Sequence, residues 1–436
     1  MPVDRIAEAA VEGDAADDAG GVDLALLADT PAQRAYPSGE RVGSLTSYTT
    51  IDGAWHSTLN QTNVLSAGTT RSTRGVSLRL GEGRMSDDLR SFNAVVQEPD
   101  TRTALTALWS MDLMYEAGLP EGVWQMVIGR GGSIGGALTD NADYMMFTGS
   151  TATATATATG RRIASDAGRR LIGASLELGG KNAVIVLDDA DIDRAAEGAV
   201  NACFPSAGQL CVSVERLYVA ESIRDAFVAR TKKLTIGAAY DYSVDVGSLT
   251  TPAQLKTVTE HVEDAVAKGA TVLAGGKARL DLGPLFHEPT ILTDVTPDMT
   301  LHSHETFGPV VSVSTYRDVD DAVTRANATA YGLNAGVWSR DGARGRAVAA
   351  RVHAGTVNVN EAFAAAWGSV DAPMGGMGDS GLGRRHGADG ILKYTEPQTV
   401  AHQRLQGFYP PARVSPETWT VLLGTALRVM KKVGMR

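Results

Sequence analysis

The sequence predicts an α/β protein whose parallel sheets are covered by helices. From about residue 91, short apolar runs alternate with longer runs in which apolar residues recur at helical spacing. The helical runs also begin and end at residues that typically cap helices. Strands that alternate with helices in this way favour a parallel sheet with helices on both faces.

The first alternating stretch extends from about residue 91 to 180. It predicts three short strands and a helix that ends before Gly118, because glycine often follows the last helical turn. The strands are expected over residues 93–96, 123–128 and 144–147, and the helix over residues 105–117.

The second stretch, from residue 181 to about 385, continues the alternation. Two of its helices are expected to begin where Asp191 and Thr251 provide side-chain caps, the second with Pro252 in its first turn. We therefore expect a second α/β unit. Its strands are expected over residues 183–187 and 310–316, and its helices over residues 191–203, 251–269 and 318–327.

The two ends of the chain depart from this alternation. Residues 1–90 are rich in Asp, Ala, Gly, Ser and Thr with weak apolar periodicity, which predicts a poorly ordered or irregular segment. Residues 393–405 are compatible with an edge strand. Apolar and basic residues alternate over 418–432, so this segment could touch a membrane surface. Packing on a partner subunit or on its own domain is the favoured interpretation.

Composition excludes several classes of protein. The 436 residues are 43% hydrophobic and 21% charged, as in an ordinary globular protein. A net charge of −10 argues against a nucleic-acid partner, which needs a concentrated basic face. No apolar run reaches membrane-spanning length. The two cysteines form no disulfide framework and the acidic start lacks a signal peptide, so a cytoplasmic location is expected.

Two short motifs carry the chemistry. Cys211 lies in the run FPSAGQLCVSVER, and Glu177 lies 34 residues upstream in LELGGK. A thiolate can add to a carbonyl, and a carboxylate can activate the water that later releases the acyl group. The two motifs together, in this order and at this separation, indicate an enzyme that oxidises an aldehyde to an acid. Cys203 lies among small apolar residues of a helix, so we expect it in the core.

From about residue 93 to 405 the chain resembles the aldehyde dehydrogenases, and especially the actinobacterial NADP-linked succinate-semialdehyde dehydrogenases. The resemblance implies their fold, a parallel-sheet nucleotide-binding domain, here incomplete at its N-terminal side, next to an α/β catalytic domain. It also implies NADP or NAD as the cofactor and no metal. The shared runs are LELGGKN at 176–182, AGQLC at 207–211, ETFGP at 305–309, GTVNVN at 355–360 and WGSVDAPMGGMGDSGLGRR at 367–385.

The resemblance also implies roles for individual residues. Cys211 matches the nucleophile, and Glu177 matches the base that activates water for thioester hydrolysis. Glu305 and Phe307 match the pair that holds the nicotinamide riboside. The remaining match, Gly149 with Ser150, begins the turn and helix that receive the cofactor phosphates, where backbone amides suit a diphosphate.

The same resemblance suggests a division of the chain into four segments. We expect an atypical N-terminal segment over residues 1–90 and a partial NAD(P)-binding domain over 91–180. A catalytic domain is expected over 181–385, and a tail that completes subunit contacts over 386–436. The chain should therefore form a homo-oligomer.

Three departures from the family pattern concern its chemistry. No Pro-Trp-Asn run supplies the asparagine of the oxyanion hole, and one such donor typically contributes about 3 kcal/mol. Glu98-Pro99 stands where the family usually has Lys-Pro, which would repel an NADP phosphate unless Arg102 compensates. A Thr-Ala repeat places six extra residues between Gly149 and Gly160, which must bulge out, extend the helix or disorder the loop.

The sequence therefore predicts NAD(P)-dependent oxidation of a small aldehyde to the carboxylic acid through a cysteine thioester. Succinate semialdehyde is the substrate that the resemblance suggests. The alternative is a catalytically impaired remnant that acts as a non-catalytic partner subunit, which the three departures favour.

Overall fold

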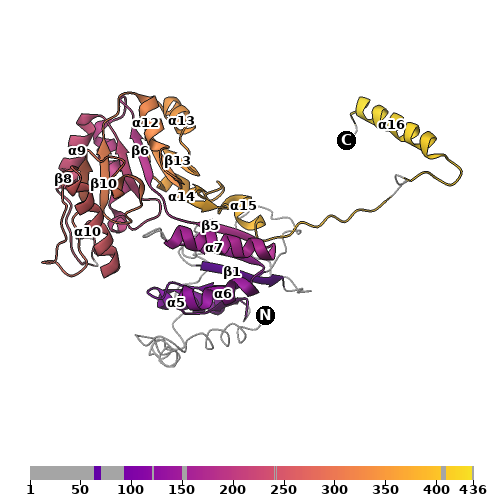
Figure 1. Cartoon of the computed structure of the whole chain (residues 1–436), viewed down its shortest axis with the longest axis horizontal. Coiled ribbons are helices and arrows are strands. Elements are labelled where there is room, and N and C mark those ends of the chain that lie inside the picture. Colours follow the sequence, from indigo (N-terminus) through magenta and orange to yellow (C-terminus); the bar gives the residue numbers. More distant parts are fainter. Residues whose placement is uncertain are drawn as a thin grey trace. The chain divides into compact units, whose positions relative to one another are not determined.

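A computed structural model describes residues 63–69, 93–119, 122–149, 155–239, 241, 243–403 and 409–434, with the backbone alone for 63–69 and 155–158. The chain divides into two compact units, Met1–Tyr394 and Thr395–Arg436 (Figure 1). Most of residues 1–90, for which an irregular segment is expected, lies outside the described residues. The expected domain boundaries within the first unit remain predictions.

The first sheet has six strands in the order β15-β5-β4-β1-β2-β3. β2 pairs with β3, and β4 with β5, in parallel, whereas β1 and β15 pair antiparallel with their neighbours. The strands are β1 (Asn63–Thr69), β2 (Asn93–Glu98), β3 (Trp124–Met126), β4 (Tyr144–Thr148), β5 (Gly173–Glu177) and β15 (Gly381–Leu382). The helices of this part are α5 (Ala104–Glu116), α6 (Gly131–Asn141) and α7 (Thr155–Arg170).

β1 is a regular element inside the segment expected to be irregular. Its Ser66 pairs with Val95 of β2 on one side and with Tyr144 of β4 on the other. The edges of β2 and β4 that face each other carry backbone donors and acceptors, and these must be paired inside a sheet. β1 therefore forms because it pairs the backbone donors and acceptors of β2 and β4, and its own apolar pattern is weak.

The second sheet has seven strands in the order β13-β12-β6-β7-β10-β9-β8, all parallel except β8. Every residue of β6, β7 and β12 is buried, which is typical of strands covered on both faces. The strands are β6 (Asn182–Val186), β7 (Val214–Tyr218), β8 (Thr271–Ala274), β9 (Thr290–Thr293), β10 (Val310–Ser314), β12 (Asn334–Trp338) and β13 (Thr356–Val359).

Two cores lie on the two faces of this sheet. Alternate residues of β6 enter different cores, Val184 and Val186 one and Ala183 and Ile185 the other, as the period of a strand requires. Helices α8 (Ile192–Cys203), α9 (Glu221–Thr231) and α10 (Pro252–Ala267) supply the first core, and α12 (Val319–Ala326) and α13 (Gly342–Ala349) the second. The predicted α/β class is confirmed (Figure 1).

The expected helix starts are confirmed at the level of single hydrogen bonds. The Asp191 side chain accepts from the backbone N–H of Arg194 at the start of α8, and Thr251 accepts from that of Gln254 at the start of α10.

The shorter elements of the first unit are η2 (Pro205–Gly208), α11 (Thr300–Ser303), β11 (Tyr331–Gly332), α14 (Ala364–Gly368), β14 (Met377–Gly378) and α15 (Gly387–Leu392).

The Thr-Ala repeat extends a helix. α7 begins at Thr155, so Thr155–Thr159 form helical backbone ahead of Gly160. Of the three outcomes expected for the insertion, helix extension is the one observed over these residues. The β-branched threonines disfavour a helix only weakly, and continuation into the amphipathic part of α7 outweighs that preference.

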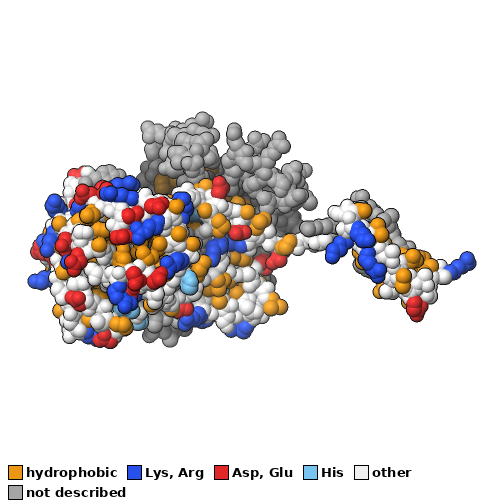
Figure 2. Space-filling view, turned by 90° about the horizontal axis from the view of Figure 1, so that it is seen from above, with side chains coloured by type: hydrophobic (Ala, Val, Ile, Leu, Met, Phe, Trp, Pro, Cys, Tyr) orange, Lys and Arg blue, Asp and Glu red, His pale blue; other side chains and the backbone are white. Residues whose placement is uncertain are grey.

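The second unit contains α16 (Pro416–Lys432), whose Ser415 caps the first turn by accepting from the N–H of Thr418. Residues 395–403 form no strand, so the edge strand expected over 393–405 is wrong for the described part. No helix of the described residues is long and apolar enough to cross a membrane. Figure 2 shows apolar and basic side chains along α16, and acidic and basic side chains interspersed over the described part of the first unit that faces the viewer.

Candidate active site

Glu177 is the last residue of β5 and is held where β15 returns to the first sheet. Gly381 pairs with Glu177, and the N–H of Leu178 donates to the carbonyl of Ser380. A Cβ on Gly381 would lie 1.9 Å from the carbonyl oxygen of Leu176, so only glycine permits this approach. The strand pairing therefore brings a segment far along the chain against the carboxylate.

Arg385 follows β15 and forms a buried ion pair with Glu177. Its Nη2 lies 3.2 Å from Glu177 Oε2, and the exposed fractions of the two residues are 6% and 5%. Its backbone N–H and carbonyl both bond to Met374 at 2.7 Å, which fixes its position. Burial raises the pKa of Glu177, and the positive charges of Arg385, Lys393 and Arg384 oppose that rise.

Cys211 lies in the loop between η2 and β7. Positive φ angles occur at three consecutive residues upstream of Cys211, namely Ser206, Ala207 and Gly208. A Cβ on Gly208 would lie 2.1 Å from the carbonyl oxygen of Gly308, so this tight turn requires glycine. The loop leaves Cys211 half-buried, whereas Cys203 is 2% exposed within the core, as expected.

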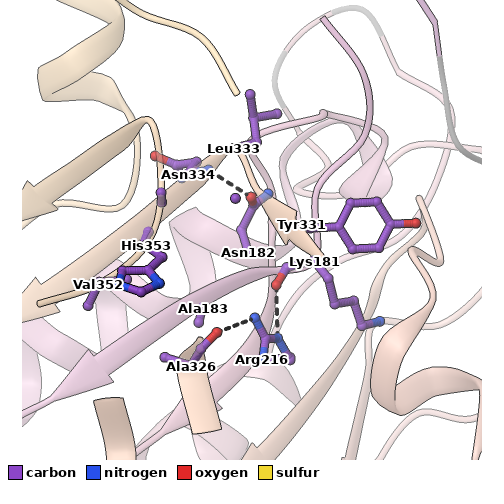
Figure 3. Close-up of a pocket in the computed structure, with 13 residues that line it drawn as sticks. Lys181, Asn182, Ala183, Arg216, Ala326, Tyr331, Leu333, Asn334, Val352 and His353 are labelled. Carbon is purple, nitrogen blue, oxygen red and sulfur yellow. Dashed lines mark hydrogen bonds between the residues drawn. The ribbon is translucent and has the colours of Figure 1, made fainter. Parts of the chain in front are cut away.

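Asn182 anchors the backbone at Cys211 and two residues after it. Its Nδ2 donates to the carbonyl of Cys211 at 2.8 Å and to that of Ser213 at 2.7 Å. Its Oδ1 accepts from the backbone N–H of Asn334 at 3.1 Å, a bond drawn in Figure 3. These three hydrogen bonds, two of them buried, hold the loop that carries Cys211 against Asn182.

The pocket of Figure 3 is structural. Arg216 donates from Nε to the carbonyl of Lys181 at 2.8 Å and from Nη2 to that of Ala326 at 2.9 Å. Lys181 in turn is fully buried and forms an ion pair with Glu215. The cavity among these residues has a volume of about 10 Å³, which is room for roughly one water. The hydrogen bonds of the residues around this cavity stabilise the loop that carries Cys211. The cavity itself is too small for a substrate.

Glu305 and Phe307 are held by the same buried network. Glu305 Oε1 accepts from the backbone N–H of Gly180 at 2.9 Å, next to the turn that follows Glu177. Phe307 is half-buried, and its N–H donates to Glu215 Oε1 at 2.9 Å. Glu215 thus positions the segment expected to meet the nicotinamide riboside.

The charges of Glu177, Glu305 and Arg385 all act on the Cys211 thiol. Burial raises the pKa of the Cys211 thiol to about 11. The charge of Arg385 lowers this pKa, and the charges of Glu177 and Glu305 raise it. In the resting site the thiol is therefore protonated at neutral pH, with a carboxylate and a cation near it.

Gly149 directly follows β4, and its N–H donates to the carbonyl of Glu177 at 3.1 Å. A Cβ at this position would lie 2.5 Å from the ring of Phe147, so a larger residue would clash. Ser150, the second residue expected at the phosphate turn, lies outside the described residues.

Comparison with known proteins identifies this arrangement. The model of the aldehyde dehydrogenase family matches residues 88–400. A Mycobacterium tuberculosis protein with the name putative succinate-semialdehyde dehydrogenase, NADP(+), 2, is 54% identical over 349 residues, which are 79% of this chain and 66% of the relative. The chain belongs to the aldehyde dehydrogenase family.

Solved aldehyde dehydrogenases share the fold. The betaine aldehyde dehydrogenase of Staphylococcus aureus, solved with NAD⁺, matches with a TM-score of 0.63 and 33% identity over 70% of this chain and 64% of that one. An NADP-dependent enzyme of E. coli matches with a TM-score of 0.64 and 37% identity, over 69% and 62% of the two chains. This chain thus spans about two thirds of the length of the relatives that it matches.

The first sheet also offers a cleft that fits part of a nicotinamide dinucleotide, the class of cofactor with which the Staphylococcus aureus relative was solved. The cleft has a volume of about 250 Å³ and lies at the carboxyl ends of β2 and β4. Ligands of open α/β sheets bind at such ends. One side is free of side chains because Gly131, Gly132 and Gly135 line it, and Leu138 and Ile163 supply apolar surface for a flat ring.

Sequence reasoning missed three residues of this aldehyde dehydrogenase site. Arg385 closes the last run shared with the family, but its contact with Glu177 depends on the pairing of β15 with β5. Asn182 also lies in a shared run, and its two bonds to the Cys211 loop were not predicted. The role of Glu215 was not predicted, and the one feature that could have indicated it is a charged residue within a buried strand.

Proposed function

We propose that the chain oxidises a small aldehyde to the carboxylic acid with NADP⁺ or NAD⁺, through a thioester on Cys211. One observation carries the proposal: Cys211, Glu177 and Arg385 act on one another within a single largely buried site. A nucleophile beside a carboxylate is what acyl-group formation and hydrolysis require.

The chemistry begins with the protonated thiol. Glu177 accepts the proton of Cys211, directly or through a water, and Arg385 stabilises the negative charge that remains. The thiolate adds to the carbonyl carbon of the aldehyde, and the backbone N–H of Cys211, by the family resemblance, donates to the resulting oxyanion. A bound nicotinamide cofactor supplies the hydride acceptor. Loss of hydride from the hemithioacetal carbon re-forms the C=O bond and leaves a thioester.

Hydrolysis completes the reaction. After the proton taken from Cys211 has passed to solvent, Glu177 removes a proton from water, the hydroxide adds to the thioester, and the C–S bond breaks to release the acid and the Cys211 thiolate. Glu177 serves better as a base when burial raises its pKa toward the working pH, and burial is the largest influence on it. The positive charge of Arg385 opposes that rise in pKa and so favours the ionised carboxylate.

Succinate semialdehyde is the proposed substrate because the 54% identical mycobacterial relative bears the name of an enzyme for it. Cys211 itself packs against a buried apolar cluster of Val212, Leu333 and Met374. We further propose a homo-oligomer in the cytoplasm. The proposal of an oligomer rests on the C-terminal tail, which completes subunit contacts in the family. The proposal of the cytoplasm rests on the two cysteines, which form no disulfide framework.

The direct test is an assay of NADP⁺ and NAD⁺ reduction by the purified chain. Succinate semialdehyde should be compared with an uncharged aldehyde of equal length, and the Cys211→Ser variant serves as the blank. Activity that requires Cys211 supports the proposal. A folded chain that binds nucleotide but oxidises no aldehyde of such a panel would favour the non-catalytic partner subunit, an alternative that the comparisons do not support.

A further inference from the structure

The cleft between α6 and α7 carries a buried carboxylate at the carboxyl end of β2. Glu98 is the last residue of β2 and lines the cleft, with an exposed fraction of 9%. A Cβ on Gly131 would lie 3.4 Å from Glu98 Oε1, so the carboxylate lies against the first residue of α6. Because residues 131, 132 and 135 are glycines, no side chain there separates this carboxylate from a ligand in the cleft.

Arg102, the cation expected to compensate for Glu98, is engaged elsewhere. Its Nε and Nη2 donate to the two oxygens of Asp100, at 2.8 and 2.6 Å, and its side chain is exposed. Among the described residues, no cation forms an ion pair with Glu98. Burial, and then the negative charge of Asp100, raise the pKa of Glu98 to about 7, so the carboxyl is ionised in about half of the molecules at pH 7 and in most of them above pH 8. Compensation by Arg102 is therefore wrong for this structure.

Arg162 of α7 is the remaining cation that lines the cleft. Its side chain is exposed to solvent, whereas Glu98 is buried. Charges act more strongly on a ligand in a buried, low-dielectric position than from an exposed one. The charge that a nucleotide meets on entering the cleft is thus set by Glu98 more than by Arg162.

We propose that Glu98 makes this chain selective for NAD⁺ over NADP⁺, contrary to the cofactor in the names of its mycobacterial relatives. The inference rests on the proposed function, since it concerns the cofactor of that reaction. In dinucleotide-binding sheets an acidic residue accepts hydrogen bonds from the ribose hydroxyls of NAD⁺, and a basic residue receives the 2′-phosphate of NADP⁺. A 2′-phosphate carries no proton to donate at neutral pH and adds charge repulsion next to Glu98.

The adenosine end can be tested alone, without aldehyde and without nicotinamide. The probes are 5′-AMP and adenosine 2′,5′-bisphosphate, which differ only in the 2′-phosphate, and binding is measured by calorimetry on the full chain. The wild type should bind 5′-AMP at least about tenfold more tightly, which corresponds to about 1.4 kcal/mol. Glu98→Gln should reduce this ratio toward one, and Glu98→Lys should invert it. NAD⁺ and NADP⁺ should show the same order.

Glu116→Gln is the matched control, because it removes the same charge from α5 at an exposed position outside the cleft. It should leave the ratio unchanged. Arg162→Ala should weaken the bisphosphate by less than Glu98→Gln strengthens it. If Glu98→Lys does not fold, Glu98→Gln decides, since it keeps the shape of the side chain.

The proposal is overturned if the wild type binds the bisphosphate as tightly as 5′-AMP, if it binds neither, or if Glu98→Gln leaves the ratio unchanged. Failure of the proposed function is a different result. A chain that oxidises no aldehyde can still show the predicted nucleotide preference, and an active enzyme can still prefer NADP⁺.

Discussion

Arg385 Nη2 lies 3.2 Å from Glu177 Oε2, and both side chains are buried. The cation thus contacts the carboxylate proposed as the base and also lowers the pKa of the Cys211 thiol. A single side chain therefore favours the ionised form of both reacting groups. Its position depends on β15, which pairs with β5 and brings residues after Gly381 to the end of the first sheet.

Replacing Arg385 by Met should shift the pH dependence of activity to higher pH. Burial raises the pKa of Glu177, and Arg385 is the largest influence that lowers it. Without the cation, Glu177 and Cys211 both hold their protons to higher pH, so the acidic limb of kcat/KM should move up by about one pH unit or more. Breaking a buried pair should also cost about 3–5 kcal/mol in the free energy of unfolding.

Arg385→Lys distinguishes a role in ionisation from a role in folding alone. It keeps the charge but not the forked donors. We expect the lysine variant to recover most of the pH profile even if its melting temperature stays low. An acidic limb that is the same in wild type, Met and Lys variants would show that Arg385 has only a structural role.

Cys211→Ala should abolish dehydrogenase activity, whereas Cys203→Ala should retain most of it. Cys211 lies half-buried among the charged groups of the site, and Cys203 lies in the core of the second sheet. Cys203→Ala should lower the free energy of unfolding by about 1 kcal/mol. Steady-state rates and melting curves on both variants check this, and equal losses of activity would refute the assignment of the nucleophile.

Glu177→Gln should slow hydrolysis of the thioester more than formation of it. The amide cannot take a proton from water, so the first turnover should give a rapid burst of reduced cofactor before a slow steady state. Stopped-flow absorbance measures the burst. Its disappearance would mean that Glu177 acts mainly in the deprotonation of Cys211, whose pKa of about 11 makes that step demanding.

Asn182→Ala should disturb the position of the Cys211 thiol, although the substitution leaves the cysteine itself unchanged. The change removes the donors to the carbonyls of Cys211 and Ser213, and each buried carbonyl left unpaired costs about 1–3 kcal/mol. Activity should fall about tenfold to a hundredfold as the loop loses these hydrogen bonds. Asn327→Ala, which removes a side-chain donor to the carbonyl of Arg351 near the surface, is the control and should keep full activity. Full activity in Asn182→Ala would contradict the anchoring role.

Removal of Ala154–Thr159 should strengthen binding of both NAD⁺ and NADP⁺. The deletion restores the run GSTATG and removes the helical extension that Thr155–Thr159 add before Gly160. The amides at the start of α7 then return to the position that suits a diphosphate. Both cofactors carry the same diphosphate, so calorimetry should show a similar gain for each. Unchanged affinity in a folded variant would identify the repeat as a harmless extension.

Much of the fold could be predicted from periodicity and caps, because those signals are local. The helices that begin after Asp191, Thr251 and Asp318 were located within one or two residues, since each cap acts on the N–H three residues later. β1 could not be predicted, because its pairing depends on β2 and β4 rather than on its own pattern. The edge strand expected at residues 393–405 is absent over the described residues 395–403, which pair with no neighbouring strand.

The sequence by itself determined the family and the identity of the two reacting groups, because Cys211 and Glu177 lie in short runs that residue types and spacing identify. Only the tertiary structure decided what surrounds them. Arg385 meets Glu177 across 208 positions of the chain, and Arg102 bonds to Asp100 instead of compensating Glu98. Charge and burial at a site depend on distances through space. The sequence predicts those distances only for residues that lie close together along the chain.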